Sequence, residues 1–421
     1  MTKPTFYWGV GIENCWMAEH EERNRPPHRL LDIFLLMQHY TQWREDLDLA
    51  ADLGINVMRY SVPWYKANPE PGVYDWRWIS KSLEYLANRR NVIPIIDLLH
   101  YGTPLWMENS ILNHDYPQRF AEYAAAFARQ FKGLVNHYTP YNEPQISAIF
   151  GGQRAYWPPY LTGLDGWSKV GLNAGRGMAL ASQALRAELP DAMLISADMC
   201  YGWQFMRRVD VGSEFRVTVQ PDERGDFDYQ VSTFPACLVY GKVDPSSPFG
   251  RVMVKAGSSE SELDWFRVNA QLPDIVGHNY YPIEFFDNPD LTLEEALAAG
   301  SRELSQGLEQ AAEVFGRPVY LTETSAGMND RAKSAWMHAA LQVITDLRGR
   351  GIDVVGMNWW PLYEVCRWEY RDSTKTVAES IKRDRWNNGL FQIEEQFDGT
   401  LGRIRTGAAD AYRDLIAGSG L

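Results

Sequence analysis

Hydrophobic positions along the chain follow two spacings, one typical of helices and the other typical of buried strands. Trp43, Leu47 and Ala50 recur at helical intervals, so they predict one apolar helix face. Gly54 follows as a residue that ends helices readily. The next segment, residues 55–60, is largely apolar and predicts a strand.

The same order of helix and strand returns along the rest of the chain. Aromatic residues spaced over 120–131 predict a helix, and residues 134–141 predict the strand after it. Apolar positions over 336–347 form another helical face, which precedes an apolar segment at 353–360. Helices and strands are therefore expected to alternate from one end to the other.

The strand segments number eight, which restricts the choice of fold. They begin near residues 6, 55, 92, 134, 193, 274, 319 and 354. Continuous apolar strands between helices indicate parallel strands that are buried on both faces. Eight strand–helix units fit an α/β fold, the (β/α)8 TIM barrel. An open doubly wound sheet is the alternative, although no GxGxxG or P-loop follows any strand to favour its nucleotide-binding forms.

The chain is longer than such a barrel requires. It has 421 residues, whereas a typical barrel needs about 250. We expect the surplus in long loops on the C-terminal face, chiefly at 200–272 and 361–388. No internal repeat is visible, so residues 1–421 are predicted to form a single (β/α)8 barrel catalytic domain.

Charge excludes one class of partner. The chain carries 41 Lys and Arg against 54 Asp and Glu, a formal net charge of −13. A nucleic-acid-binding protein needs a basic surface to neutralise phosphates, so none is expected as a partner. No apolar stretch approaches the ~20 residues that span a bilayer, and no signal peptide is visible at the start, so no membrane partner is expected.

The cysteines predict a cellular location, and the aromatic content suggests a class of ligand. The four cysteines, Cys15, Cys200, Cys237 and Cys366, lack metal-ligand spacing and predict reduced thiols in a cytoplasmic protein. The chain has 16 Trp and 22 Tyr. Aromatic faces stack on sugar C–H groups, which would favour a carbohydrate ligand, while a Trp-rich core explains the same composition.

Polar and aromatic side chains follow several predicted strands, where a barrel carries its active site. These residues are Asp97, His100, Asn142, Glu143, Asn279, Tyr280, Tyr281, Thr322, Glu323, Trp359 and Trp360. Glu143 and Glu323 come from strands that lie near each other at a barrel mouth. Two carboxylates there would suit glycoside hydrolysis, with a separation of about 5–5.5 Å in a retaining enzyme. A helix-capping or ion-paired role is the alternative for either glutamate alone.

With these residues in view, the sequence resembles glycoside hydrolase family 1 over nearly its whole length. The family's motifs are matched, in order, by Phe6-Tyr7-Trp8-Gly9, Met58-Arg59-Tyr60, Leu98-Leu99-His100, Thr139-Pro140-Tyr141-Asn142-Glu143-Pro144, Asn279-Tyr280-Tyr281 and Leu321-Thr322-Glu323. The fourth motif has one more residue between Thr and Asn than the family pattern. The resemblance implies a β-glycosidase on a TIM barrel that uses no cofactor.

The resemblance also implies the catalytic roles. Glu323 would be the nucleophile that attacks the anomeric carbon, with Arg59 and Tyr281 as the neighbours that favour its ionised form. Glu143 would be the general acid and later the general base. It must start protonated, and a nearby carboxylate raises its pKa in that direction.

Other positions would bind the sugar. Asn142 would bond the 2-hydroxyl group, and Asn279 belongs to a motif that lines the same site. His100 would bond another hydroxyl, unless it is a structural histidine. Trp360 would form the platform beneath the glycon ring.

One departure from the family pattern concerns the charge of the glycon pocket. Seven residues after the platform Trp, the family's glucosidases carry a Glu that binds the 4- and 6-hydroxyls, followed by a Trp. Here these positions hold Arg367 and Trp368. A guanidinium only donates hydrogen bonds and prefers anions, so Arg367 suggests a glycon with an acidic group, such as a uronate or a phosphate. The alternative is that Arg367 pairs with Glu364 or Glu369.

Two further departures lie in the first and sixth of these motifs. The family's glycon-binding Gln is replaced at the matching position by Trp16, and Glu13 or Asn14 nearby are alternative substitutes. After Glu323 the chain continues with Thr324 rather than the family's Asn-Gly. The glycon pocket is therefore expected to differ from the usual glucosidase pattern.

The sequence as a whole predicts a retaining β-glycosidase that acts on a small carbohydrate or glycoside without a metal, since no clustered ligand set is present. A transglycosidase would use the same carboxylates and pass the sugar to another acceptor. A non-catalytic sugar-binding barrel is the third interpretation. The sequence does not predict an oligomeric state.

Overall fold

A computed structural model describes residues 5–17, 29–199, 211–327 and 329–421. The chain divides into two compact units. Unit 1 consists of Met1–Pro63, Trp76–Asp97 and Ile275–Leu421. Unit 2 consists of Trp64–Asp75 and Leu98–Asp274.

Unit 1 contains a parallel sheet whose strands are buried along most of their length. In spatial order its strands are β5 (Ile93–Asp97), β4 (Val57–Ser61), β1 (Tyr7–Ile12), β11 (Val354–Trp359), β10 (Val319–Thr324) and β9 (Val276–Tyr280). These strands confirm the predicted segments near residues 6, 55, 92, 274, 319 and 354. Burial on both faces explains why they read as continuous apolar runs.

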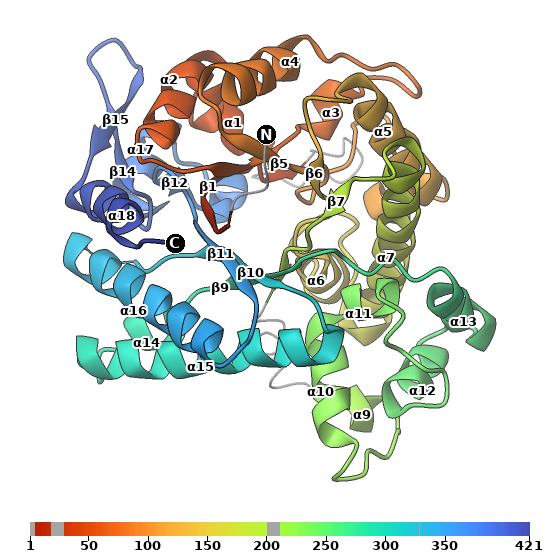
Figure 1. The fold of residues 1–421 in the computed structure, drawn as a ribbon. Coiled ribbons are helices and arrows are strands. Elements are labelled where there is room, and N and C mark those ends of the chain that lie inside the picture. Colours follow the sequence, from red (N-terminus) through yellow and green to blue (C-terminus); the bar gives the residue numbers. More distant parts are fainter. Residues whose placement is uncertain (1–4, 18–28, 200–210, 328) are drawn as a thin grey trace. The chain divides into compact units, whose positions relative to one another are not determined.

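The helices of unit 1 lie between these strands in the sequence or follow the last of them. The longer ones are α2 (His39–Ala51), α4 (Arg77–Glu84), α15 (Leu293–Phe315), α16 (Asp330–Gly349) and α18 (Gly407–Gly418). Gly54 has a φ of +85° just after α2, so it ends that helix region as predicted. Figure 1 shows α15 and α16 side by side, and the two helices are in contact. Their apolar faces meet around Trp336, which is fully buried.

The chain after β11 contains small elements that the hydrophobic pattern did not predict. They are β12 (Val365–Cys366), η5 (Trp368–Asp372), α17 (Val377–Arg383), β13 (Arg385–Trp386), β14 (Phe391–Glu395) and β15 (Leu401–Arg405). β14 and β15 form an antiparallel hairpin around Asp398-Gly399, a dipeptide typical of hairpin turns. The predicted insertion at 361–388 is therefore partly ordered into helix and strand.

Unit 2 contains short parallel strands that end at polar residues. β6 (His137–Thr139) pairs with β7 (Met193–Leu194), and β8 (Asp198–Met199) follows. Backbone hydrogen bonds extend this pairing, because the Asn142 N–H donates to Leu99 and the Glu143 N–H donates to Ala197. The strands predicted near 134 and 193 are confirmed, the second as two short pieces.

Two long helices of unit 2 pack against each other, α5 (Tyr116–Gln130) and α7 (Gly163–Glu188). Further helices fill the segment after β8, where a loop insertion was expected. They are α9 (Val211–Glu214), α10 (Arg224–Thr233), α11 (Ala236–Val239), α12 (Pro248–Lys255) and α13 (Glu260–Val268). The expectation of a loop was wrong for this described part, because the Ser and Pro residues begin helices there. Ser247 and Ser259 are N-caps, and Pro248 occupies the first helical position of α12.

Three cysteines fall among the described residues, and Cys200 lies outside them. Cys15, Cys237 and Cys366 are buried and are not in disulfides. Across the described residues, no helix combines the length and the apolar character that crossing a bilayer requires.

Candidate active site

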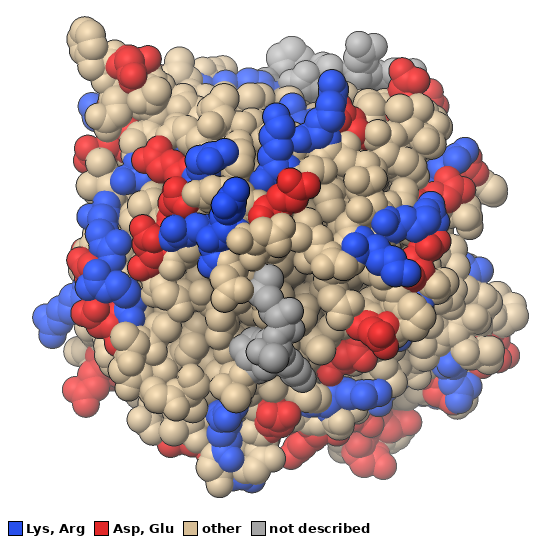
Figure 2. All heavy atoms as spheres, turned by 45° about the horizontal axis from the view of Figure 1, so that its top comes forward, with Lys and Arg blue, Asp and Glu red and all other residues tan. Residues whose placement is uncertain are grey.

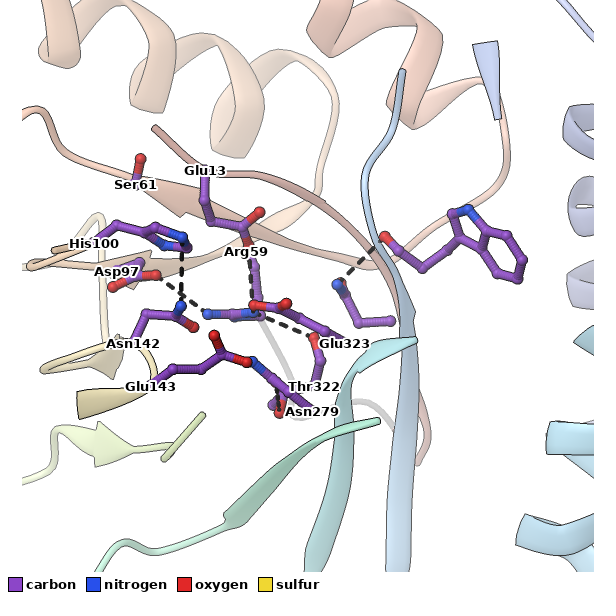
Figure 3. Close-up of polar contacts among 12 residues, drawn as sticks. Glu13, Arg59, Ser61, Asp97, His100, Asn142, Glu143, Asn279, Thr322 and Glu323 are labelled. Carbon is purple, nitrogen blue, oxygen red and sulfur yellow. Dashed lines mark hydrogen bonds and ion pairs between the residues drawn. The ribbon is translucent and has the colours of Figure 1, made fainter. Parts of the chain in front are cut away.

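Arg59, on β4, is the centre of a charged cluster at the C-terminal end of the unit 1 sheet. Its side chain is fully buried. Among the residues that the structure describes, three carboxylates lie around its guanidinium group (Figure 3). Arg59 Nη1 pairs with Glu323 and lies 3.5 Å from Oε1 of Glu13, and Nη2 lies 3.2 Å from Oδ2 of Asp97. The predicted position of Arg59 next to Glu323 is therefore seen in the structure.

Glu323 lies near the end of β10 and is held through both of its carboxylate oxygens. Arg59 donates to Oε1, and the hydroxyl of Tyr281 donates to Oε2 over 2.5 Å. Glu323 is 4% exposed, so the two donors take the place of most of its water. The carboxylate is thus fixed in orientation at the carboxyl end of a parallel strand, where barrels carry catalytic groups.

Asn279 supports this strand end from the neighbouring strand, β9. It lies opposite Glu323 in the register of β9 and β10. Thr322 Oγ1 donates a hydrogen bond of 2.7 Å to Oδ1 of Asn279, and both residues are fully buried (Figure 3). The predicted contact of Asn279 with the substrate stays a prediction.

Aromatic side chains continue the site from Tyr281. The ring of Trp360, just after β11, lies edge-on to Tyr281 at 6.0 Å and to Trp386 at 5.8 Å. Trp386 in turn lies edge-on to Trp368 at 4.8 Å. Trp360 and Trp368 were both predicted for the glycon pocket, and Trp386 was missed. Trp386 also pairs with Val365 across β12 and β13.

The first-strand region differs from what residue counting suggested. Trp16 lies on β2 (Trp16–Met17), pairs with Asp32 on β3 (Leu31–Asp32) and is 2% exposed. Glu13, which the sequence offered as an alternative, is the residue of this segment that contacts the Arg59 cluster. A role for Trp16 in sugar binding stays a prediction.

Arg367 occupies the position of the family's hydroxyl-binding Glu, and its side chain is exposed. Its backbone N–H donates to the carbonyl of Asp384 over 3.2 Å. Glu364, one of the two acidic partners that we considered for it, forms an ion pair with Arg385 at 2.7 Å. Burial raises the pKa of Glu364, and the charge of Arg385 opposes that rise.

Unit 2 carries the second predicted catalytic glutamate. Glu143 precedes the short helix α6 (Pro144–Ile146) and is 7% exposed. The hydroxyl of Tyr101 donates to Oε2 of Glu143 over 2.5 Å, and Asn142 Nδ2 donates to the same hydroxyl over 3.0 Å. Asn142 Nδ2 also lies 3.4 Å from Nε2 of His100 (Figure 3). The structure thus brings Asn142, His100 and Glu143 together through Tyr101, which sequence reasoning missed, and their roles stay predictions.

The backbone at this site adopts an uncommon conformation twice. Glu143 has a φ of +41° and Tyr101 a φ of +78°. Residues other than glycine rarely adopt such φ angles. Those that do cluster at functional sites, where the surrounding structure holds them in place. The two strained residues are the two that share the hydrogen bond.

Comparison with known proteins identifies the family of the chain. The sequence matches glycosyl hydrolase family 1 over residues 19–313. The chain belongs to glycosyl hydrolase family 1. The matched residues include Glu143 and end before Glu323, while similarity in structure extends over the whole chain.

Several family 1 proteins are similar to it. A bifunctional β-D-glucosidase/β-D-fucosidase of Bifidobacterium breve is 29% identical over 295 residues, which are 63% of this chain and 58% of that protein. β-Glucosidase 44 of Arabidopsis thaliana is 26% identical over 132 residues, 30% of this chain and 26% of its own length. The chain thus matches only about a quarter to three fifths of the length of these curated relatives.

Solved structures of family 1 resemble the chain from end to end. The family 1 β-glucosidase from Thermotoga maritima matches it with a TM-score of 0.76 at 17% identity, over 100% of this chain and 99% of that one. The same enzyme in complex with noeuromycin matches with a TM-score of 0.75 at 18% identity, over 100% and 99%. This likeness confirms the predicted fold class, an α/β protein of the (β/α)8 TIM barrel type. The grouping of residues 1–421 as one catalytic domain stays a prediction.

Within the described residues, no group of three or more His, Cys, Asp or Glu side chains is placed to hold a metal ion. The acidic residues around Arg59 are arranged about a guanidinium group.

Proposed function

We propose that this family 1 protein is a retaining β-glycosidase in which Glu323 is the nucleophile and Glu143 is the general acid and base. The observation that carries the proposal is the orientation of Glu323 by Arg59 and Tyr281 at the end of β10. A nucleophilic carboxylate must stay ionised and point one oxygen at the anomeric carbon. Family membership and β-glucosidase relatives support the same activity.

In the first step, a carboxylate oxygen of Glu323 forms a bond to the anomeric carbon. The glycosidic C–O bond breaks, and Glu143 gives its proton to the departing oxygen. In the second step, Glu143 takes a proton from water as the water oxygen attacks the same carbon. The bond to Glu323 then breaks, and the sugar leaves with its β configuration restored. The two carboxyl groups would lie about 5–5.5 Å apart in such an enzyme.

Two residues of unit 2 would assist Glu143. Tyr101 donates to Glu143, so it would hold the carboxyl group toward the glycosidic oxygen. Asn142, which donates to Tyr101, would bond the 2-hydroxyl group of the sugar through its amide group. Trp360 would form the platform beneath the ring, and Asn279, Trp368 and Trp16 would line the pocket.

The substrate would be a small β-glycoside. The pocket that binds its glycon would be altered from the usual glucosidase pattern. The exposed Arg367 is the residue that would accept an acidic glycon, as a guanidinium donates to anions. The similar β-glucosidase from Thermotoga maritima has been solved in complex with noeuromycin and with deoxynojirimycin. These complexes support a sugar as the ligand. Transfer to another acceptor would use the same residues, and product analysis with an added alcohol would separate it from hydrolysis.

The test is release of 4-nitrophenol from a panel of aryl β-glycosides by the wild type, Glu323→Ala and Glu143→Ala. We expect turnover of at least one glycoside, and a loss of about 10⁴-fold or more in Glu323→Ala, because removing a covalent nucleophile leaves only binding contributions. Added azide should restore part of the rate by occupying the vacated space. Proton NMR of the first product should show the β anomer. Unchanged activity of Glu323→Ala, or a first product of α configuration, would contradict the proposal.

A further inference from the structure

Tyr101 is hydrogen-bonded directly to the proposed general acid, although the sequence analysis gave it no role. Its hydroxyl group donates to Oε2 of Glu143 over 2.5 Å. Tyr101 is 3% exposed and Glu143 is 7% exposed, so water competes little for this hydrogen bond. A separation this short is typical of a hydroxyl group that donates to an ionised oxygen, and such bonds are about twice as strong as neutral ones. Tyr101 therefore has a strong hold on one oxygen of Glu143.

Aromatic neighbours hold the ring of Tyr101 independently of Glu143. His100 lies edge-on to it with 4.6 Å between ring centroids, and Trp157 lies at 5.0 Å with a tilt of 45°. Both neighbours are buried. The φ of +78° at Tyr101 is an angle that a residue with a side chain keeps only where its surroundings fix it. The hydroxyl group is thus set in place by packing, and the carboxyl group of Glu143 is positioned against it.

The direction of the hydrogen bonds follows from the chemistry of the donors and acceptors. Nδ2 of Asn142 donates to the hydroxyl oxygen of Tyr101 over 3.0 Å, and the same nitrogen lies 3.4 Å from Nε2 of His100. An amide nitrogen donates and does not accept, so the oxygen of Tyr101 is the acceptor in this contact. A phenol has one proton, which is therefore directed to Glu143. Asn142 and Tyr101 thus form a chain of donors that ends on Oε2 of Glu143.

This chain of donors distinguishes the two oxygens of Glu143. In a protonated carboxyl group one oxygen is a carbonyl and the other carries the proton, and the carbonyl oxygen is the better acceptor. Because Oε2 accepts from Tyr101, it takes the carbonyl role and the proton lies on Oε1. After the proton has left, the donor at Oε2 stabilises the carboxylate, and Oε1 is again the oxygen that takes up a proton. One oxygen is thereby kept for proton transfer in both steps of the reaction.

We propose that Tyr101, held by Asn142, is a positioning residue that keeps the transferable proton of Glu143 on Oε1. The inference rests on the proposed function and adds a residue through which general acid catalysis is controlled. Tyr101 acts through Glu143 and forms no bond to the reacting atoms. Without its hydroxyl group the carboxyl group could rotate and carry its proton on either oxygen. Fewer enzyme molecules would then present a proton to the departing oxygen of the aglycone.

The nature of the aglycone shows whether a residue serves the general acid. An alkyl alcohol leaves only when its oxygen receives a proton, whereas 2,4-dinitrophenol is a strong enough acid to leave as the anion. The ratio kcat/KM includes the steps up to the departure of the aglycone. A residue that positions the proton therefore affects kcat/KM of alkyl glycosides far more than that of dinitrophenyl glycosides. A residue that binds the sugar or supports the fold affects both equally.

The test compares Tyr101→Phe with the wild type on the methyl and 2,4-dinitrophenyl β-glycosides of whichever sugar is turned over. We expect kcat/KM to fall about 10- to 100-fold for the methyl glycoside, as for a lost hydrogen bond to a charged group, and less than about 3-fold for the dinitrophenyl glycoside. Glu143→Ala should show the same dependence on the aglycone with a larger loss, because it removes the acid itself. Tyr138→Phe is the control, since that buried hydroxyl donates to the carbonyl of Val135 over 3.3 Å, and it should leave both rates unchanged. Equal losses of Tyr101→Phe on the two glycosides, or no loss on the methyl glycoside, would overturn the proposal.

Crystal structures separate this inference from the proposed function. If the wild type turns over no glycoside, or if Glu143→Ala loses equally on both aglycones, the assignment of Glu143 as the general acid fails. Crystal structures of the wild type and Tyr101→Phe then test Tyr101 alone. We expect the carboxyl group of Glu143 to take a different orientation in the variant, because the donor that holds Oε2 is gone. An unchanged orientation would mean that Tyr101 does not position Glu143.

Discussion

Arg59 shows how one buried cation organises the chemistry of unit 1. Its guanidinium group pairs with Glu323 and has Glu13 and Asp97 as further partners. A buried ion cluster of this kind contributes little net stability while intact, but the loss of one member leaves uncompensated charges in a low-dielectric environment. The same residue therefore supports both the fold and the orientation of the proposed nucleophile.

Replacing Arg59 with Ala should destabilise the protein strongly. The change leaves buried carboxyl groups without their cation, so we expect the free energy of unfolding at pH 7 to fall by about 3–5 kcal/mol. Urea denaturation measures it. Arg350→Ala is the matched control, because Arg350 forms an exposed pair with Glu309 that should be worth about 1 kcal/mol or less. Equal losses in the two variants would contradict the role of Arg59.

Tyr281→Phe should lower the rate without unfolding the protein. The variant removes the hydroxyl that donates to Glu323 over 2.5 Å. A hydrogen bond to a charged group contributes about 1.5–3 kcal/mol, so kcat on the best glycoside should fall about 10- to 100-fold. Tyr412→Phe is the control, since that hydroxyl donates to the backbone carbonyl of Gly9. We expect the control to lower stability and to leave kcat unchanged, and the reverse pattern would count against the assignment.

Asp198 provides a prediction about pH. Burial raises the pKa of Asp198 to about 6, although hydrogen bonds from Tyr240, Ser196 and Gln145 oppose the rise. A carboxyl group with a raised folded-state pKa contributes stability below its unfolded pKa, near 4, and loses it as the pH rises through 6. The shift of about 2 units corresponds to roughly 3 kcal/mol.

Asp198→Asn should therefore match the wild type near pH 4 and become more stable than it by up to about 3 kcal/mol at pH 7. The amide oxygen can still accept the hydrogen bond that Tyr240 donates to Asp198 over 2.8 Å. Urea denaturation at both pH values measures the difference. A variant that is less stable than the wild type by the same amount at both values would rule out this linkage.

At the scale of elements, close contact between two glycines joins the segment after Glu143 to a long helix. α7 packs against η4 (Ser147–Gln153), which follows α6 and therefore Glu143. A side-chain carbon at Gly166 on α7 would lie 2.1 Å from the backbone oxygen of Gly152 on η4. The two backbones can approach this closely because neither residue has a side chain.

Gly166→Ala should thus separate α7 from η4 and displace the chain next to Glu143. We expect a loss of about 2 kcal/mol or more in stability, as for overpacking in a core, and a lower kcat. Gly225→Ala, in the helix α10, is the control, because nothing lies within 4 Å of an added carbon there. The control should gain about 0.5–1 kcal/mol from helix propensity. Thermal unfolding and kinetics check both variants, and a harmless Gly166→Ala would show that η4 can move aside.

At the scale of the whole molecule, charge is the property with the clearest consequence. The formal net charge of −13 would repel anionic ligands at long range and leave neutral sugars unaffected. On the face drawn in Figure 2, Lys and Arg side chains lie among Asp and Glu side chains. In the segment that follows Arg367, Lys375 forms an ion pair with Asp384.

Solubility should follow this charge. The isoelectric point is near 5.2, so we expect the lowest solubility near pH 5 and a several-fold higher solubility at pH 7, where self-repulsion is large. Turbidity and the concentration of protein left in solution measure it. Equal solubility at the two pH values would mean that the net charge is not the dominant factor.

The sequence by itself determined the alternation of helices and strands, the strand ends that carry Asn142, Glu143, Tyr281, Glu323 and Trp360, and the family resemblance. These features are local, because burial on both faces of a parallel strand leaves a continuous apolar run that stops where the polar site residues begin. The helices after β8 also have local signals in the sequence, because Ser247 and Ser259 are their N-caps. Composition alone suggested a loop there.

Only the tertiary structure decided which side chains meet. Counting along the first strand pointed to Trp16, but β1 ends at Ile12 and the chain then turns so that Trp16 pairs with Asp32. Glu13 is thereby left beside Arg59. Tyr101, which donates to Glu143, has a backbone with a positive φ. Such contacts join residues far apart in the sequence or depend on a single backbone angle, and neither leaves a periodic signal for sequence analysis to detect.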